Sequence, residues 1–153
     1  MFFEIIGNIR QVRVQRERHY YHAIVVAGRE AQQRNISIIE PYLLMYGALR
    51  SATHLRMRIV DSDFNWVNLI SKVSSEIEMN VLPKYYDPLA QVIMGPDAKS
   101  TLRTVHNIIA EYKSDYPKVE HLLYALIQHK EIANLSAEYG LTEKCLLPIM
   151  TPF

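Results

Sequence analysis

Residues 17–52, ERHYYHAIVVAGREAQQRNISIIEPYLLMYGALRSA, decide the fold class because their apolar side chains recur at helical spacing. This spacing places such side chains on one face of a helix. We expect a first helix over residues 16–33, whose apolar face consists of Tyr20, Ala23, Ile24, Ala27 and Ala31. The stretch after Pro41 is the most apolar in the chain, so it predicts a central helix that runs to about residue 58.

The residues between these two helices carry signals for a helix end and a helix start. Arg34 and Asn35 follow the last apolar position of the first helix and predict its end. Ser37 and Glu40 have the spacing of a capping box, in which both side chains satisfy free amides at a helix start. Pro41 also fits a helix start, because backbone N–H groups in the first turn have no partner within the helix and proline, which lacks the N–H, therefore loses no hydrogen bond there.

The rest of the chain continues the helical pattern. Four further segments are bounded by cap residues, glycines or prolines: a helix capped by Asp61 or Ser62 and ended by Pro83, a short helix over 88–94, a helix capped by Asp97 or Ser100, and a helix that begins at Pro117. The predicted fold class is therefore all-α, with residues 1–153 forming a single compact domain of about five to seven helices. No internal repeat is apparent.

The two ends of the chain depart from this pattern. Around Gly7-Asn8, β-branched residues on both sides indicate a two-residue hairpin, although the apolar residues there also share one helical face. We favour a short β-hairpin or an extended arm over residues 1–15. At the other end, Pro148 predicts a non-helical tail over residues 148–153, because proline cannot supply the N–H that a helix interior needs.

The composition excludes several classes of protein. The chain of 153 residues is 49% apolar and 22% charged, which is typical of a globular protein. Its apolar runs are far shorter than the roughly 18 residues that span a bilayer, and the N-terminus lacks the pattern of a signal peptide. The single cysteine, Cys145, excludes an intramolecular disulfide and fits a reducing compartment. We expect a cytoplasmic protein without a membrane partner.

The sequence assigns no metal, no cofactor and no catalytic residue. His19 and His22 are neighbours on one helix, but no carboxylate or cysteine has matching spacing, and the arginines around them would repel a cation. Cys145 lacks a setting that would favour its thiolate. Glycine-rich phosphate loops are absent from the sequence. A binding activity is therefore favoured over an enzymatic one.

The basic residues are unevenly divided along the chain. Residues 1–71 hold nine arginines, no lysine and six acids, a net charge of +3, whereas residues 72–153 hold seven lysines, Arg103 and ten acids, a net charge of −2. The planar guanidinium binds phosphate and carboxylate oxygens through two parallel hydrogen bonds. The candidate anion-binding residues fall in two groups, Arg10, Arg13, Arg16 and Arg18, and Arg50, Arg56 and Arg58.

These two groups predict a non-enzymatic binding or adaptor module whose partner is anionic, either nucleic acid or an acidic protein surface. An acidic surface is also present in the second half of another copy, so the prediction extends to a homo-oligomer. A structural subunit of a larger assembly is an alternative. The tail PIMTPF supports it, because an apolar end with two prolines suits the groove of a partner.

Residues 17–52 also resemble the amino-terminal helix pair of YaaC-like proteins, on Tyr20-Tyr21 and on the run from Pro41 to Gly47. Those proteins belong to the HEPN class of small helical proteins, whose members include ribonuclease toxins. The resemblance implies a ribonuclease in which an arginine binds the phosphate and a histidine, four to six residues later, exchanges a proton. Arg13 with His19 and Arg16 with His22 have that spacing, although chance alone produces such pairs at this composition.

A second resemblance lies near the C-terminus. Residues 131–150, EIANLSAEYGLTEKCLLPIM, are similar to the helix-turn-helix of AraC-type regulators, with Gly140 in the turn and Thr142 as the cap of the second helix. The resemblance implies that the second helix enters the major groove of DNA. A plain helical hairpin is the alternative, because Pro148 would end the second helix early.

Overall fold

The computed structural model describes residues 2–52, 54–55, 59 and 64–150, and only the backbone of residues 2–17. The all-α prediction is confirmed. The helices are α1 (Phe2–Gln33), α2 (Pro41–Ser51), α3 (Trp66–Glu76), α4 (Leu82–Tyr85), α5 (Pro96–Glu111), α6 (Val119–Leu126), α7 (Lys130–Glu138) and α8 (Glu143–Met150), with a π-helical turn η2 (Ile77–Val81) and two short strands, β1 (Ile38–Ile39) and β2 (Ile93–Met94). None of the described helices has both the length and the apolar composition needed to cross a membrane.

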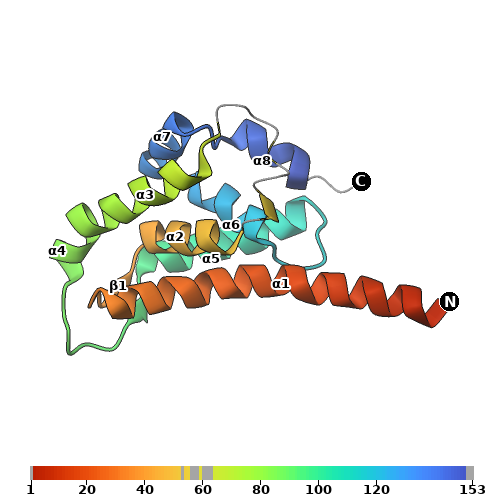
Figure 1. Cartoon of the computed structure of the whole chain (residues 1–153), viewed down its shortest axis with the longest axis horizontal. Coiled ribbons are helices and arrows are strands. Elements are labelled where there is room, and N and C mark those ends of the chain that lie inside the picture. The colour runs from red at the N-terminus through yellow and green to blue at the C-terminus, as the bar shows by residue number, and fades with distance from the viewer. Residues whose placement is uncertain (1, 53, 56–58, 60–63, 151–153) are drawn as a thin grey trace.

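Helix α2 is the central helix, as predicted. It packs against α1, α3, α5 and α6, and eight of its eleven residues are buried. Figure 1 shows α1 running along one side of the molecule, with its first half extending beyond the remaining helices. The predicted face of α1 is correct, since Tyr20, Ala23, Ala27 and Ala31 are all buried. The alanines recur every four residues on this face, and their small side chains allow α1 and α2 to pack close together.

The closest approach of α1 and α2 is at Gly47. A Cβ atom added there would lie 2.1 Å from the carbonyl oxygen of Ala23 and 3.1 Å from the amide nitrogen of Ala27. Both atoms belong to the backbone of α1, so no side chain can move aside to make room. The hydrogen atom of glycine is therefore what allows the two helix backbones to pack directly against each other.

A two-residue parallel sheet ties the two halves of the chain together. Ile38 pairs with Ile93 and Ile39 with Met94. The amide of Gly95 then donates to the carbonyl of Ile39 at 3.0 Å. Each strand is followed at once by a helix that begins with proline, α2 at Pro41 and α5 at Pro96. The strand pair thus sets the N-termini of α2 and α5 side by side.

The prediction for the N-terminus is wrong, because residues 2–15 belong to helix α1 rather than to a hairpin or arm. Phe2, Ile6 and Ile9 do share one helical face, and this period outweighs the turn signal of Gly7-Asn8. A glycine inside a helix costs only about 1 kcal/mol relative to alanine, so a long helix tolerates it.

The prediction of a tail from residue 148 is also wrong within the described residues, because helix α8 continues through Pro148 to Met150. The lost hydrogen bond is compensated by packing, since Leu146 and Met150 are both buried. Residues 151–153 lie outside the described part of the chain.

Three further boundaries differ from the predicted ones. Helix α2 ends at Ser51, and residues 56–58 of its predicted extension lie outside the described part of the chain. Pro83 does not stop the third helix, because it stands in the first turn of α4, where proline is tolerated. The predicted helix over 88–94 is instead a turn followed by β2. Its start is set by the amide of Leu89, which donates to the carboxylate of Asp87 at 3.0 Å.

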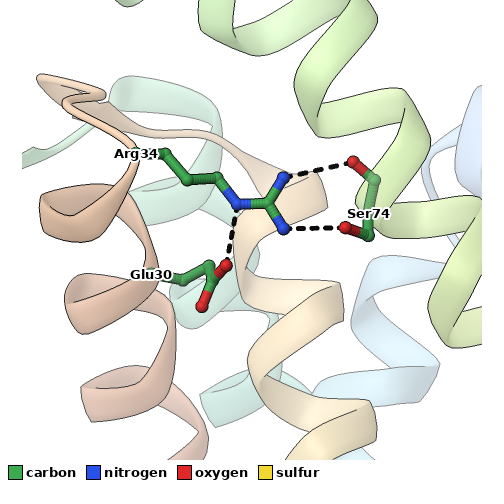
Figure 2. A network of polar contacts seen from close by, with 3 residues as sticks. All are labelled: Glu30, Arg34 and Ser74. Atoms are coloured by element: carbon green, nitrogen blue, oxygen red, sulfur yellow. Dashed lines mark hydrogen bonds and ion pairs between the residues drawn. The ribbon is translucent and has the colours of Figure 1, made fainter.

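Arg34, one of the nine arginines of the first half, has a structural role at the end of α1. Its Nε donates to Glu30 at 2.7 Å, and its two terminal nitrogens donate to the carbonyl and the hydroxyl of Ser74 at 3.2 and 2.7 Å. Figure 2 shows that the guanidinium bridges the end of α1 and the last turn of α3. The backbone turns sharply after Arg34, because Asn35 has a positive φ of 58°, as the predicted helix end requires.

Replacing Arg34 with alanine is expected to lower the free energy of unfolding by about 1–3 kcal/mol, because several charge-assisted hydrogen bonds are lost and Glu30 is left beside α3 without its partner. Arg29→Ala, at an exposed position of the same helix, is the control and should change stability by less than about 0.5 kcal/mol. Urea denaturation followed by circular dichroism measures both values. Equal effects of the two substitutions would show that the bridge of Figure 2 adds nothing.

Candidate functional site

Two adjoining cavities open on the face where α2, α3, α5 and α7 meet. The first has a volume of about 220 Å³ and the second about 650 Å³, and they share Tyr42 and Glu131. The first is lined by Glu40, Pro41, Tyr42, Asp97, His129, Lys130, Glu131 and Ile132, and the second by Tyr42, Lys72, Glu76, Asn80, Glu131, Asn134, Leu135 and Glu138. We refer to the two together as the α2–α7 groove.

The first cavity is formed by the starts of three helices. The strand pair places Glu40 and Asp97 beside each other, at the N-termini of α2 and α5. The predicted capping box is not formed, because Glu40 is the residue before α2 and its side chain makes no cap hydrogen bond. Ser37 instead donates to the carbonyl of Tyr85 at 3.0 Å. The carboxylate of Glu40 is therefore part of the cavity wall rather than of the helix start.

His129 is held at the wall of the first cavity by a buried threonine. Its Nε2 lies 2.7 Å from the hydroxyl of Thr101, which itself donates to the carbonyl of Asp97 at 2.9 Å. Because the threonine hydroxyl has one proton, it must accept from the imidazole, and His129 carries its proton on Nε2. This hydrogen bond also connects the start of α7 to the first turn of α5.

The second cavity lies between the end of α3 and one face of α7. On the α3 side, Lys72 and Glu76 form an ion pair at 3.5 Å, and Asn80 donates to Glu76 at 2.6 Å. In an α-helix, two side chains that are four residues apart are offset by about 40° around the helix axis. A π-turn has more residues per turn, so this offset is smaller there. Because Asn80 lies in η2, its side chain stays in line with Glu76 along the cavity wall.

The α7 side of the second cavity carries two carboxylates. Glu131 and Glu138 stand seven positions apart and therefore lie on the same face of the helix, with Asn134 between them. Leu135 lines the cavity beside them and is 8% exposed. The groove thus combines an apolar base with exposed acidic rims.

Tyr42 lies where the two cavities meet. Burial raises the pKa of its hydroxyl above the ordinary value, and Glu76 and Glu131 raise it further. The two carboxylates belong to opposite walls of the second cavity, so both walls act on the same tyrosine. The lining of the whole groove holds five carboxylates against Lys72 and Lys130. The α2–α7 groove is therefore acidic.

Of the arginines proposed from the sequence, Arg18 and Arg50 do not line this groove. Arg18 and Arg50 are exposed, on α1 and at the end of α2, and the guanidinium of Arg50 lies 5.9 Å from the ring centre of Tyr46. The backbone of Arg10, Arg13 and Arg16 belongs to α1, but their side chains lie outside the described part of the structure. Arg56 and Arg58 lie outside it altogether.

His19 and His22, whose spacing from Arg13 and Arg16 fits the ribonuclease motif, have other partners. His22 Nδ1 lies 3.0 Å from the hydroxyl of Ser51, and the ring of His19 stacks on that of His54 with centroids 4.5 Å apart. His106 is exposed on α5. In the part of the chain that the structure describes, no three histidine, cysteine or acidic side chains are placed to hold a metal ion together.

The family model of the Clp repeat (R) N-terminal domain matches residues 18–137 of the chain. The chain belongs to this family.

Solved structures of similar fold include two further N-terminal domains. The N-terminal domain of Hsp104 from Candida albicans is 17% identical, with a TM-score of 0.69 and coverage of 85% of each chain. The N-terminal domain of the ClpV1 ATPase from the Sci1 type VI secretion system of E. coli is 14% identical, with a TM-score of 0.63 over 96% of this chain and 98% of that one. A protein of a malarial protein secretion system is 18% identical, with a TM-score of 0.73 over 86% and 89%.

No curated protein sequence matches the chain. The family assignment nevertheless overturns the function predicted from the sequence. The chain is a Clp repeat domain, so neither a module for an anionic partner, whether nucleic acid or acidic protein, nor a HEPN-like ribonuclease nor a structural subunit describes it. Helix α7 lies within the residues that match the family model, and α8 packs against α6. Ile132, Leu135 and Leu146 of these two helices are buried.

The residues of the α2–α7 groove were not found from the sequence. Glu40, Asp97 and Glu131 are separated by tens of residues, and only the pairing of β1 with β2 and the packing of α7 bring them together. The sequence did contain a local signal for the first cavity. Glu40-Pro41 and Gly95-Pro96 both begin helices directly after isoleucine or methionine, and an acid, Glu40 or Asp97, lies next to each proline.

Proposed function

We propose that this chain is a protein-docking domain that holds a segment of a partner polypeptide in the α2–α7 groove. The observation that carries the proposal is the continuity of the two cavities through Tyr42 and Glu131. The two cavities adjoin at these residues, and the larger cavity alone is within the range of about 300–1,000 Å³ typical of ligand pockets. Two adjoining cavities lined from several helices can take successive side chains of one polypeptide.

The family membership supports the same proposal. Its solved relatives include N-terminal domains of Hsp104 and of the ClpV1 ATPase, and one relative comes from a protein secretion system. We infer that this chain likewise serves a cytoplasmic machine that acts on other proteins and contributes recognition rather than chemistry. The groove offers an aromatic anchor, an apolar base and hydrogen-bonding rims, which are the elements of peptide recognition.

Asn134→Trp is expected to block the groove, because the side chain is exposed at the wall of the second cavity and an indole there would fill it. Selection from a displayed library of random dodecapeptides on the wild-type domain should yield binders. Their affinity, measured by fluorescence anisotropy, should fall by about tenfold or more in the variant. Peptides bound through other faces would lose nothing.

Asn107→Trp is the matched control, since Asn107 is equally exposed but lies on α5 and lines neither cavity. It should leave the affinity unchanged. Failure of the library to yield any binder, or equal effects of the two tryptophans, would contradict docking in the α2–α7 groove.

A further inference from the structure

We infer that the docked segment presents a lysine or arginine side chain to the second cavity, where its charged end lies between Glu131 and Glu138. This inference rests on the proposed docking function and names the chemistry of the partner. The larger cavity has three carboxylates, of which only one is already bound by neighbouring side chains within the described part of the domain.

The carboxylates of the second cavity differ in what they already bind. Glu76 is occupied, because it pairs with Lys72 and accepts from Asn80. Among the described residues, Glu131 and Glu138 make no ion pair and no side-chain hydrogen bond. Lys72 is thus already paired with Glu76, and the α7 wall keeps two negative charges that no ion pair among the described residues neutralises.

The shape of the cavity suits a long side chain with a charged end. Tyr42 and Leu135 line it with an aromatic ring and an aliphatic side chain, and both lie next to the acidic α7 face. The methylene groups of lysine or arginine pack on such surfaces while the charged end reaches the rim. The tyrosine ring adds a favourable face for a cation.

Alternative occupants fit this cavity less well. An acidic segment would meet three carboxylates and one lysine that is already paired. A bare metal ion lacks a set of ligands, because the described residues contain no group of three metal-binding side chains close enough to share one. An organic cation on a polypeptide satisfies both the charge of the rim and the length of the groove.

The basic residue of a selected dodecapeptide provides the test. Replacing that residue with glutamine should weaken binding to the wild-type domain by about fivefold, and Glu138→Lys should weaken the original peptide by about tenfold. Glu111→Lys, at an exposed position near the far end of α5, is the matched control and should have no effect. Changing the peptide base to glutamate should restore binding to the Glu138→Lys domain, because the charges are then exchanged.

The outcomes separate this inference from the docking function. Selected peptides that contain no base, or whose base can be replaced without loss, would overturn the inference while Asn134→Trp still shows docking. Free spermine, used at the same charge concentration, should not displace the peptide; displacement would show that any polycation binds and would also overturn it. A library that yields no binder would overturn both proposals.

Discussion

Replacing Gly47 with alanine is expected to lower the free energy of unfolding by about 2–3 kcal/mol and the melting temperature by roughly 5–10 °C. By helix propensity alone the substitution would stabilise α2 by about 1 kcal/mol. The new Cβ, however, would lie 2.1 Å from the carbonyl oxygen of Ala23, so α1 and α2 must separate. Their contact is the most extensive between any two elements, and separation loosens the whole core. Differential scanning calorimetry measures the change.

Gly28→Ala is the matched control, and we expect the opposite sign. Gly28 also lies inside a helix, but the nearest atom to an added Cβ is Ile39 Cδ1 at 4.0 Å, which is an ordinary contact. The propensity gain should then appear as an increase of about 0.5–1 kcal/mol in stability. A stabilising Gly47→Ala would mean that the helices are not held at the distance seen in the structure.

Acidification is expected to destabilise the domain through His121. This residue is fully buried, and its Nδ1 accepts from the amide of Lys118 at 3.0 Å, which caps α6. Burial, reinforced by the charge of Lys118, lowers the pKa of the imidazole from 6.5 to about 4. The unfolded state therefore binds the proton more readily, and stability is present above pH 6.5 and falls as the pH drops towards 4. A pKa difference of this size corresponds to about 3 kcal/mol.

The contribution of His121 can be isolated by comparing variants between pH 7 and pH 4. His121→Asn keeps an oxygen acceptor for the Lys118 amide but does not titrate, so it should be less stable at pH 7 and lose less stability on acidification. His106→Gln removes an exposed histidine and should leave the wild-type pH dependence unchanged. Urea denaturation at each pH gives the free energies. Parallel curves for His121→Asn and the wild type would exclude this histidine as the cause.

The helical core could be predicted from the sequence because it depends on local spacing. The apolar face of α1 and the predicted helices that correspond to α2 and α6 were correct, since buried apolar residues recur there every three to four positions. Helix boundaries were less predictable where two signals competed. At Gly7-Asn8 the turn signal was weaker than the helical period, and at Pro148 burial of the flanking residues outweighed the missing hydrogen bond.

The candidate site could not be predicted for a different reason. The residues that line the α2–α7 groove are spread along the sequence from Glu40 to Glu138. A local pattern of apolar and polar residues therefore cannot indicate that they lie together. The two arginine groups were conspicuous because their members are close in the sequence, but Arg18 and Arg50 do not line the groove. Arg34, which lies outside both groups, joins α1 to α3.

The pairing of β1 with β2 has a consequence for how the domain acquires its function. Ile38 and Ile93 are 55 positions apart, so their pairing closes a long loop, which costs conformational entropy. The pairing can form only when both halves of the chain are present. The first cavity depends on that contact, because the strands align the starts of α2 and α5. A nascent chain that has not yet supplied α5 and α7 has no groove to offer. With the docking function proposed above, a partner segment could be held only after α5 and α7 have folded onto the first half of the chain.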